Sequence, residues 1–93
     1  MGILAKAPDA DLDYGIDWQA YLQAGETLAS SDWDIVPEET SGLSAAATRL
    51  TETETAVRLI GGRAGHGYRI ANRVTTSAGR TDVRSLFIQV QTR

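Results

Sequence analysis

The stretch YRIANRVTTSAGRTDVRSLFIQVQT, residues 68–92, decides the fold of this chain. Its first part places alternate side chains on one face of an extended strand, namely Tyr68, Ile70, Asn72, Val74 and Thr76. Its last part returns with the same two-residue period, which carries Leu86, Ile88 and Val90. Between them, residues 77–80 have the length and the glycine of a tight connection. The sequence therefore predicts an antiparallel hairpin of residues 68–76 and 81–92.

The same alternation predicts further strands ahead of the hairpin, at residues 12–18, 27–36, 43–48 and 55–60. In the first of these, apolar side chains alternate with aspartates and a glycine, as a half-buried strand requires. We expect Asp17 to cap a single helical turn that contains Trp18, Tyr21 and Leu22. The alanines of residues 44–50 would also suit a short helix, but the flanking Ser, Thr and Gly favour a strand.

Six to seven short antiparallel strands are typical of an all-β, immunoglobulin-like β-sandwich. We expect residues 11–93 to form this single domain and residues 1–10 to form a flexible N-terminal arm. Tyr68 follows a glycine-rich loop near the start of the penultimate strand, which is the position of a tyrosine corner. Trp33 is expected to provide the bulky core residue that a sandwich without disulfides needs.

Composition narrows the class of protein further. The chain has 93 residues, a net charge of −3 and no cysteine, which excludes disulfides and thiolate metal sites and fits synthesis in a reducing cytoplasm. Residues 58–93 hold seven arginines and one aspartate, whereas the first 26 residues are acidic. This polarity is either a mixed, solvated surface or a guide to head-to-tail packing between copies. The acidic balance argues against nucleic acid as a partner, and no apolar run is long enough to span a membrane.

No constellation of residues predicts catalysis. His66, the only histidine, lies in a glycine-flanked loop, and no acidic residue near it in the sequence could hold it as a general base. Residues 9–13 resemble the start of a calcium loop but are not followed by its turn glycine and closing glutamate. The glycines of residues 61–67 lack the Lys-Ser/Thr pair of a phosphate loop. We therefore predict a protein that is not an enzyme and has no catalytic residue, metal or cofactor.

Aromatic and apolar side chains instead predict a surface for partner proteins. Trp18 and Tyr21 share one face of the helical turn, and Phe87 is out of phase with the inward residues of its strand. Such residues mark contact surfaces, although they also serve to cover the ends of a core. Ile3 and Leu4 in the arm are too few to fold alone but suffice to dock on a neighbour. These five residues are the predicted partner-binding residues.

Two long segments together resemble a known family. They are LDYGIDWQAYLQAGETLASSDWDI, residues 12–35, and RLIGGRAGHGYRIANRVTTSAGRTDVRSLFIQV, residues 58–90. The motifs in them are Asp17-Trp18, Ser30-Ser31 with Trp33, Gly61-Gly62, Tyr68-x-Ile70-x-Asn72-x-Val74-Thr75-Thr76 and Gly79-Arg80-Thr81-Asp82. In this order and spacing they resemble the phage fibre–tail adaptor proteins, small structural proteins of tailed bacteriophages and prophages. Residues 43–54 carry no part of the resemblance.

The resemblance implies a virion protein that is made in the bacterial host cytoplasm and assembles with other tail, neck or fibre proteins. It also implies multiple copies, arranged as a homo-oligomeric ring. The alternative is a stand-alone carbohydrate- or surface-binding module, because small sandwiches often carry ligands on their end loops. Such a module would be monomeric and would show an aromatic platform, whereas an adaptor would form rings or bind tail proteins.

Overall fold

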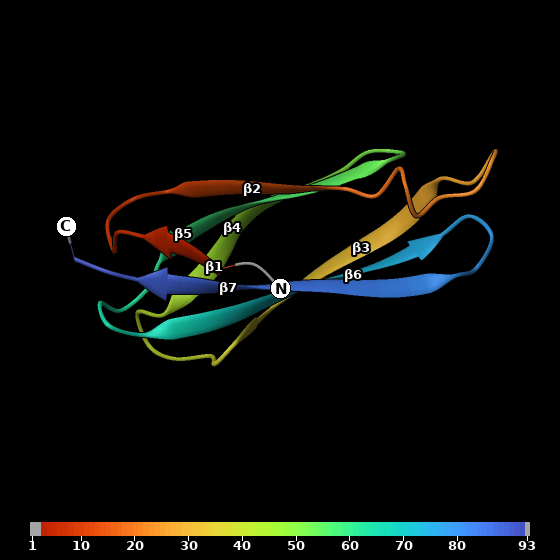
Figure 1. The fold of residues 1–93 in the computed structure, drawn as a ribbon. Helices are drawn as coiled ribbons and strands as arrows, with labels where there is room; N and C mark the ends of the chain where they lie inside the picture. The colour runs from red at the N-terminus through yellow and green to blue at the C-terminus, as the bar shows by residue number, and fades with distance from the viewer. Residues whose placement is uncertain (1–2, 93) are drawn as a thin grey trace.

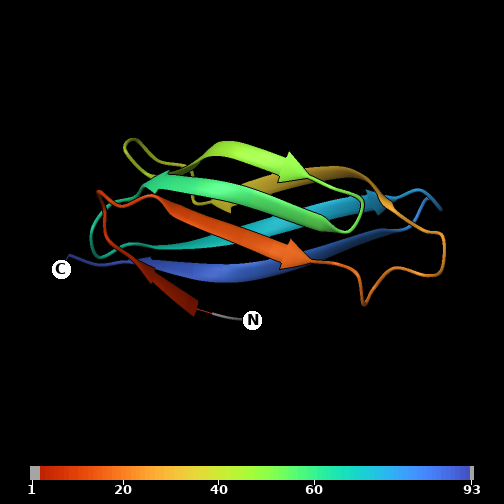
Figure 2. The same ribbon diagram turned by 90° about the horizontal axis from the view of Figure 1, so that it is seen from above.

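The computed structural model describes residues 3–92, which form seven strands in two stacked sheets (Figures 1 and 2). The strands are β1 (Ile3–Lys6), β2 (Leu12–Asp17), β3 (Leu28–Val36), β4 (Leu43–Leu50), β5 (Glu54–Gly61), β6 (Gly67–Thr76) and β7 (Thr81–Val90). The all-β prediction is confirmed, and every strand predicted from alternation is present within two residues of its expected bounds. The hairpin of β6 and β7 is confirmed as an antiparallel pair.

The order of strands is that of an immunoglobulin-like sandwich. One sheet has the order β1-β7-β6-β3 and the other the order β2-β5-β4, and Figure 2 shows the two stacked. If β2 to β7 are taken as strands B to G, these are the C-F-G and B-E-D groups of that fold. Four strand pairs are antiparallel as predicted, but β1 runs parallel to β7.

Part of the expected N-terminal arm is a strand. Residues 3–6 form β1, in register with residues 87–90 of β7. The Lys6 side chain is 3% exposed, and its Nζ donates to the carbonyl oxygens of Gly61 (2.7 Å) and Ala7 (2.8 Å). Burial lowers the pKa of Lys6, while the nearby carboxylates of Asp11 and Asp9 act in the opposite direction. The expectation of a flexible arm is therefore corrected for residues 3–6, while residues 1–2 lie outside the described residues.

The core lies between the sheets in two clusters. The larger contains Leu43, Val57, Leu59, Tyr68, Ile70, Leu86, Ile88 and Val90, and the smaller contains Ile16, Trp18, Leu28 and Val74. The inward residues predicted for β5, β6 and β7 are all buried. The prediction for Trp33 is corrected, because its side chain is only partly buried and packs against the margin of both clusters. Trp18, which is 0% exposed, is the bulky core residue instead.

Hydrogen bonding explains why Trp18 is the buried tryptophan. Its Nε1 donates to Thr55 Oγ1 (3.2 Å) and Asn72 Oδ1 (3.1 Å). Asn72 Nδ2 in turn donates to Ser31 Oγ (2.8 Å) and to the Asp32 carbonyl oxygen (3.0 Å). The Trp33 Nε1 atom, by contrast, is buried without a partner in residues 3–92, which costs about 1–3 kcal/mol. The interior therefore provides acceptors for one indole and not for the other.

Candidate partner-binding surfaces

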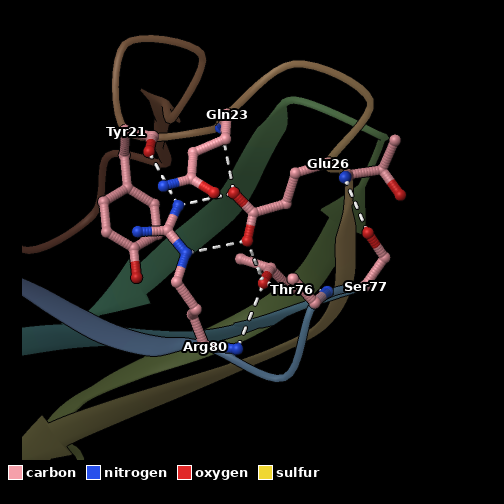
Figure 3. A network of polar contacts seen from close by, with 8 residues as sticks. Tyr21, Gln23, Glu26, Thr76, Ser77 and Arg80 are labelled. Atoms are coloured by element: carbon pink, nitrogen blue, oxygen red, sulfur yellow. Dashed lines mark hydrogen bonds and ion pairs between the residues drawn. The ribbon is translucent and has the colours of Figure 1, made fainter.

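One end of the sandwich is closed by the loop of residues 18–27, which packs on the turn between β6 and β7 (Figure 3). Asp17 Oδ1 accepts a hydrogen bond from the Gln19 N–H (2.9 Å), and the N–H groups of Tyr21 and Leu22 donate to the Trp18 carbonyl oxygen. The Asp-capped turn expected here is thus present, as an isolated turn. This turn ends well before Glu26, the residue whose hydrogen bonds attach the loop to the turn between β6 and β7.

Glu26 is a buried carboxylate with a complete set of donors. Arg80 donates to both of its oxygens, from Nη2 (2.5 Å) and Nε (2.9 Å), as Figure 3 shows. Thr76 Oγ1 and the Gln23 N–H donate as well. These hydrogen bonds, first from Arg80 and then from Thr76 and Gln23, lower the pKa of Glu26 to about 2. The same guanidinium lies 4.3 Å from the Tyr21 ring centroid and donates to the Tyr21 carbonyl oxygen.

We expect Glu26 to make the free energy of unfolding fall as the pH drops from 4.5, its ordinary pKa, to about 2. In that window the unfolded carboxylate takes up a proton and the folded one does not, so acid favours the unfolded state. Urea unfolding at a series of pH values should show a shallower decline for Glu26→Gln than for the wild type. The control Glu52→Gln changes an exposed carboxylate and should follow the wild type. Parallel curves for Glu26→Gln and the wild type would contradict this role of Glu26.

The two aromatic residues that sequence analysis placed together in this turn differ in how deeply they are buried. Trp18 was predicted to bind a partner, but its full burial leaves no surface to contact. Tyr21 is partly exposed and packs edge-to-face on Trp18, with 5.6 Å between ring centroids. The prediction is wrong for Trp18 because its strand phase continues from Ile16 into the core. A contact role for Tyr21 stays a prediction.

At the other end of the sandwich, Glu39 joins two loops. Its Oε1 accepts a hydrogen bond from the Tyr68 hydroxyl and lies 2.9 Å from His66 Nδ1. The Tyr68 hydroxyl oxygen accepts from the Arg63 N–H (3.0 Å), so Tyr68 holds the glycine-rich loop as a tyrosine corner does. Hydrogen bonding from Tyr68 is the main cause that lowers the pKa of Glu39. Sequence analysis missed Glu39 as the partner of His66, because 27 residues separate the two.

The outer side of β6 and β7 carries exposed apolar and basic side chains, and we call it the β6–β7 face. On β7, Val83 and Phe87 are 42% and 38% exposed. On β6, Arg73 lies opposite Val83 and Arg69 lies opposite Phe87. Within residues 3–92 neither arginine belongs to an ion pair. Apolar side chains beside unpaired positive charge suit contact with an acidic partner surface.

The predicted contact residues meet this face to different degrees. Phe87 is exposed on it as expected, and Val83, which sequence analysis missed, shares the strand phase that identified Phe87. Ile3 is in register with Phe87 on the adjoining strand β1. Leu4 is in register with Ile88 and is exposed. Contact roles for Ile3, Leu4 and Phe87 stay predictions.

The outer side of the three-stranded sheet carries small residues between charged ones, and we call it the small-residue face. Gly15 and Ala56 lie opposite each other on β2 and β5, and Ala47 on β4 is close by. A shallow hollow of about 400 Å³ lies over these alanines. Asp17 and Glu54 are opposite each other at one end of the face. Arg49 and Arg58 line the hollow as well, so this face carries charges of both signs.

A groove of about 530 Å³ lies between β3 and the start of β4. Apolar side chains line it, including Trp33, Ile35 and Leu43, and the exposed Glu38 lies at its margin. Glu39, whose carboxylate is already engaged by Tyr68, borders it as well. The groove therefore combines an apolar wall with negative charge.

The described part of the chain holds no cluster of three or more residues that could bind a metal ion. Nor does it contain a helix long and apolar enough to cross a membrane.

Sequence analysis described an acidic N-terminal part and an arginine-rich C-terminal part of the chain, and the structure joins the two by an ion pair. Asp13 forms an ion pair with Arg58 across β2 and β5 at 2.9 Å, and the Arg58 hydrogen bond is the main cause that lowers the pKa of Asp13.

Comparison with known protein families finds a match. The model of a family described as podophage GP4 fiber-tail adaptor protein gp77 matches residues 6–89 of this chain. A search of curated proteins finds no match. The matched residues contain β2 to β6 entirely and β7 up to Gln89, and with them both outer faces and the groove.

Proposed function

Because this chain belongs to the family of podophage fiber-tail adaptor proteins, we propose that it binds neighbouring tail or fibre proteins through the β6–β7 face. As a member of this family it is a structural adaptor of the phage tail and fibre. The observation that carries the proposal is the exposure of Val83 and Phe87 beside two arginines without ion-pair partners. A structural family also supports a role without catalysis, in a virion component made in the host cytoplasm.

Assembly of several copies into a ring belongs to the same proposal. The β6–β7 face and the small-residue face lie on opposite sides of the sandwich (Figure 2). One carries exposed apolar side chains and arginines, and the other carries small residues between charges of both signs. Contacts between two different faces of identical chains are heterologous, and they close into a ring when the rotation permits it. Sedimentation of the purified chain over a range of concentrations measures whether it self-associates.

The alternative of a carbohydrate-binding module gains no support. Phe87 is the one aromatic residue among the exposed large apolar side chains of residues 3–92. A sugar platform generally needs flat aromatic surface, whereas a protein interface needs apolar side chains within a polar rim. The mixture of Val83, Phe87 and arginines fits the second description.

We expect the double variant Val83→Asp/Phe87→Asp to reduce incorporation into phage particles by about tenfold or more, as loss of central interface contacts does. Both side chains point outward, so the variant should fold as the wild type does. Mass spectrometry of purified particles measures incorporation, and circular dichroism checks the fold. The control is Ala24→Asp, an exposed residue of the 18–27 loop that lies outside this face. Normal incorporation of the folded double variant would refute a contact role for this face.

A further inference from the structure

The sandwich is open along one side, where β3 ends one sheet and β4 ends the other. Residues 44–50 of β4 are exposed throughout. Yet the register places Ala45, Thr48 and Leu50 opposite buried residues of β5, on the side that faces the core. Within residues 3–92 the inner side of β4 is therefore uncovered, and no strand pairs with its outer edge.

The free edge of β4 has little protection against pairing. Exposed edge strands in natural proteins are usually short, charged or covered, because their backbone groups invite another strand. β4 is eight residues long and carries one charged side chain, Arg49. A register shift between Ala45 and Ala47 is its only irregularity within the described pairing. Such an edge is suited to receive an added strand.

The groove beside this edge supplies the side-chain contacts that an added strand needs. Trp33 and Ile35 on β3 form its apolar wall, opposite Leu43 and Ala45 on β4. The Trp33 Nε1 is buried and has no acceptor in residues 3–92. Buried donors in native proteins are nearly always paired with protein or ordered water, and this one leaves a hydrogen bond that a bound segment can accept.

The negative charge of the groove favours a basic segment as its occupant. Glu38 lines the groove and belongs to no ion pair within residues 3–92. Glu39 adds a second carboxylate, one that already contacts His66 and Tyr68. An occupant with lysine or arginine is therefore favoured over an acidic one.

We propose that the groove between β3 and β4 binds an extended, basic segment of a partner virion protein, added as a strand along the free edge of β4. Main-chain hydrogen bonds to β4 provide the pairing, and alternate apolar side chains cover Trp33 and Ile35. A lysine or arginine side chain of the segment meets Glu38. This proposal takes from the adaptor function only that the partner is a virion protein. The proposed site itself lies away from the β6–β7 face. Two separate surfaces allow one chain to hold two partners.

The test measures binding of the full chain to overlapping synthetic peptides that cover the tail and fibre proteins of the same phage, and this chain itself. Fluorescence anisotropy gives the affinities, and amide hydrogen exchange of the complexes locates the bound peptide. We expect basic peptides with alternating apolar residues to bind and to slow exchange in residues 43–50. Glu38→Lys should weaken binding about tenfold, whereas Glu52→Lys, the same charge change outside the groove, should leave it unchanged.

Trp33→Phe gives a second readout, because it keeps an aromatic ring in the wall and removes only the N–H donor. We expect weaker peptide binding with no loss of folding stability. The proposal fails if no virion peptide binds, or if only peptides of this chain bind, which would make the occupant a second copy. It also fails if bound peptides protect β7 instead of β4, or if Glu38→Lys and Trp33→Phe bind as the wild type does. Incorporation of the Val83→Asp/Phe87→Asp variant tests the other face, so the two proposals fail separately.

Discussion

Trp18→Ala is expected to lower the free energy of unfolding by about 3–5 kcal/mol, the range for removal of a fully buried aromatic side chain. The indole is 0% exposed, joins the smaller core cluster and donates to Thr55 and Asn72. Truncation leaves a cavity between the sheets and takes a donor from both acceptors. Urea unfolding followed by circular dichroism measures the loss.

Trp33→Ala is the matched control, because the residue type is the same and the burial is not. Trp33 is partly exposed, and its N–H has no partner to lose. We expect its truncation to cost about 1–2 kcal/mol, since part of the lost surface was never removed from water. Equal losses of the free energy of unfolding for the two variants would show that Trp18 does not stabilise the core more than Trp33 does.

Asn72→Ala is expected to cost about 3 kcal/mol, because one side chain joins three strands through hydrogen bonds. Its amide contacts Trp18, Thr55 and Ser31 and also the Asp32 carbonyl oxygen. Truncation leaves several of these buried groups without a partner, at about 1–3 kcal/mol for each unsatisfied group, less what water recovers. The measurement is again urea unfolding.

The control for Asn72→Ala is Arg73→Ala, the next residue on β6, whose side chain points outward. Exposed substitutions of this kind usually change stability by less than about 0.5 kcal/mol. A double-mutant cycle between Trp18→Phe and Asn72→Ala should show coupling, because the two side chains share a hydrogen bond. Additive effects, or an Asn72→Ala variant as stable as the wild type, would rule out a central role for this network.

Strands were predictable because their signal is local. Alternation in residues 68–76 and 81–90 is a property of neighbours in sequence, and it gave the correct inward face of β6 and β7. It also gave β4, although the alanines there would suit a helix. β1 was missed, because a four-residue strand pairs only with β7, which lies more than eighty residues later in the chain.

The polar contacts that fix the site were not predictable, because their partners are distant in sequence. Trp18 and Asn72 are 54 residues apart, as are Glu26 and Arg80. No residue near Trp18 in the sequence indicates that its N–H has a hydrogen-bond acceptor. Which of the two tryptophans is buried could therefore not be predicted from neighbouring residues. The β6–β7 face was only half predictable: alternation identified Phe87, while the adjacent arginines required the register of the hairpin.

The parallel pairing of β1 with β7 also determines how the chain responds to a mechanical force. Tension applied to the chain before Ile3 and after Val90 pulls these two strands in opposite directions along their length. Their cross-strand hydrogen bonds are then strained in shear, all at once, whereas an antiparallel hairpin pulled at its open end unzips one bond at a time. The Lys6 ammonium, bound to the Gly61 carbonyl oxygen, links the end of β1 beside Val90 to the other sheet. A strand of four residues thus resists extraction by the combined strength of its bonds rather than by the weakest of them.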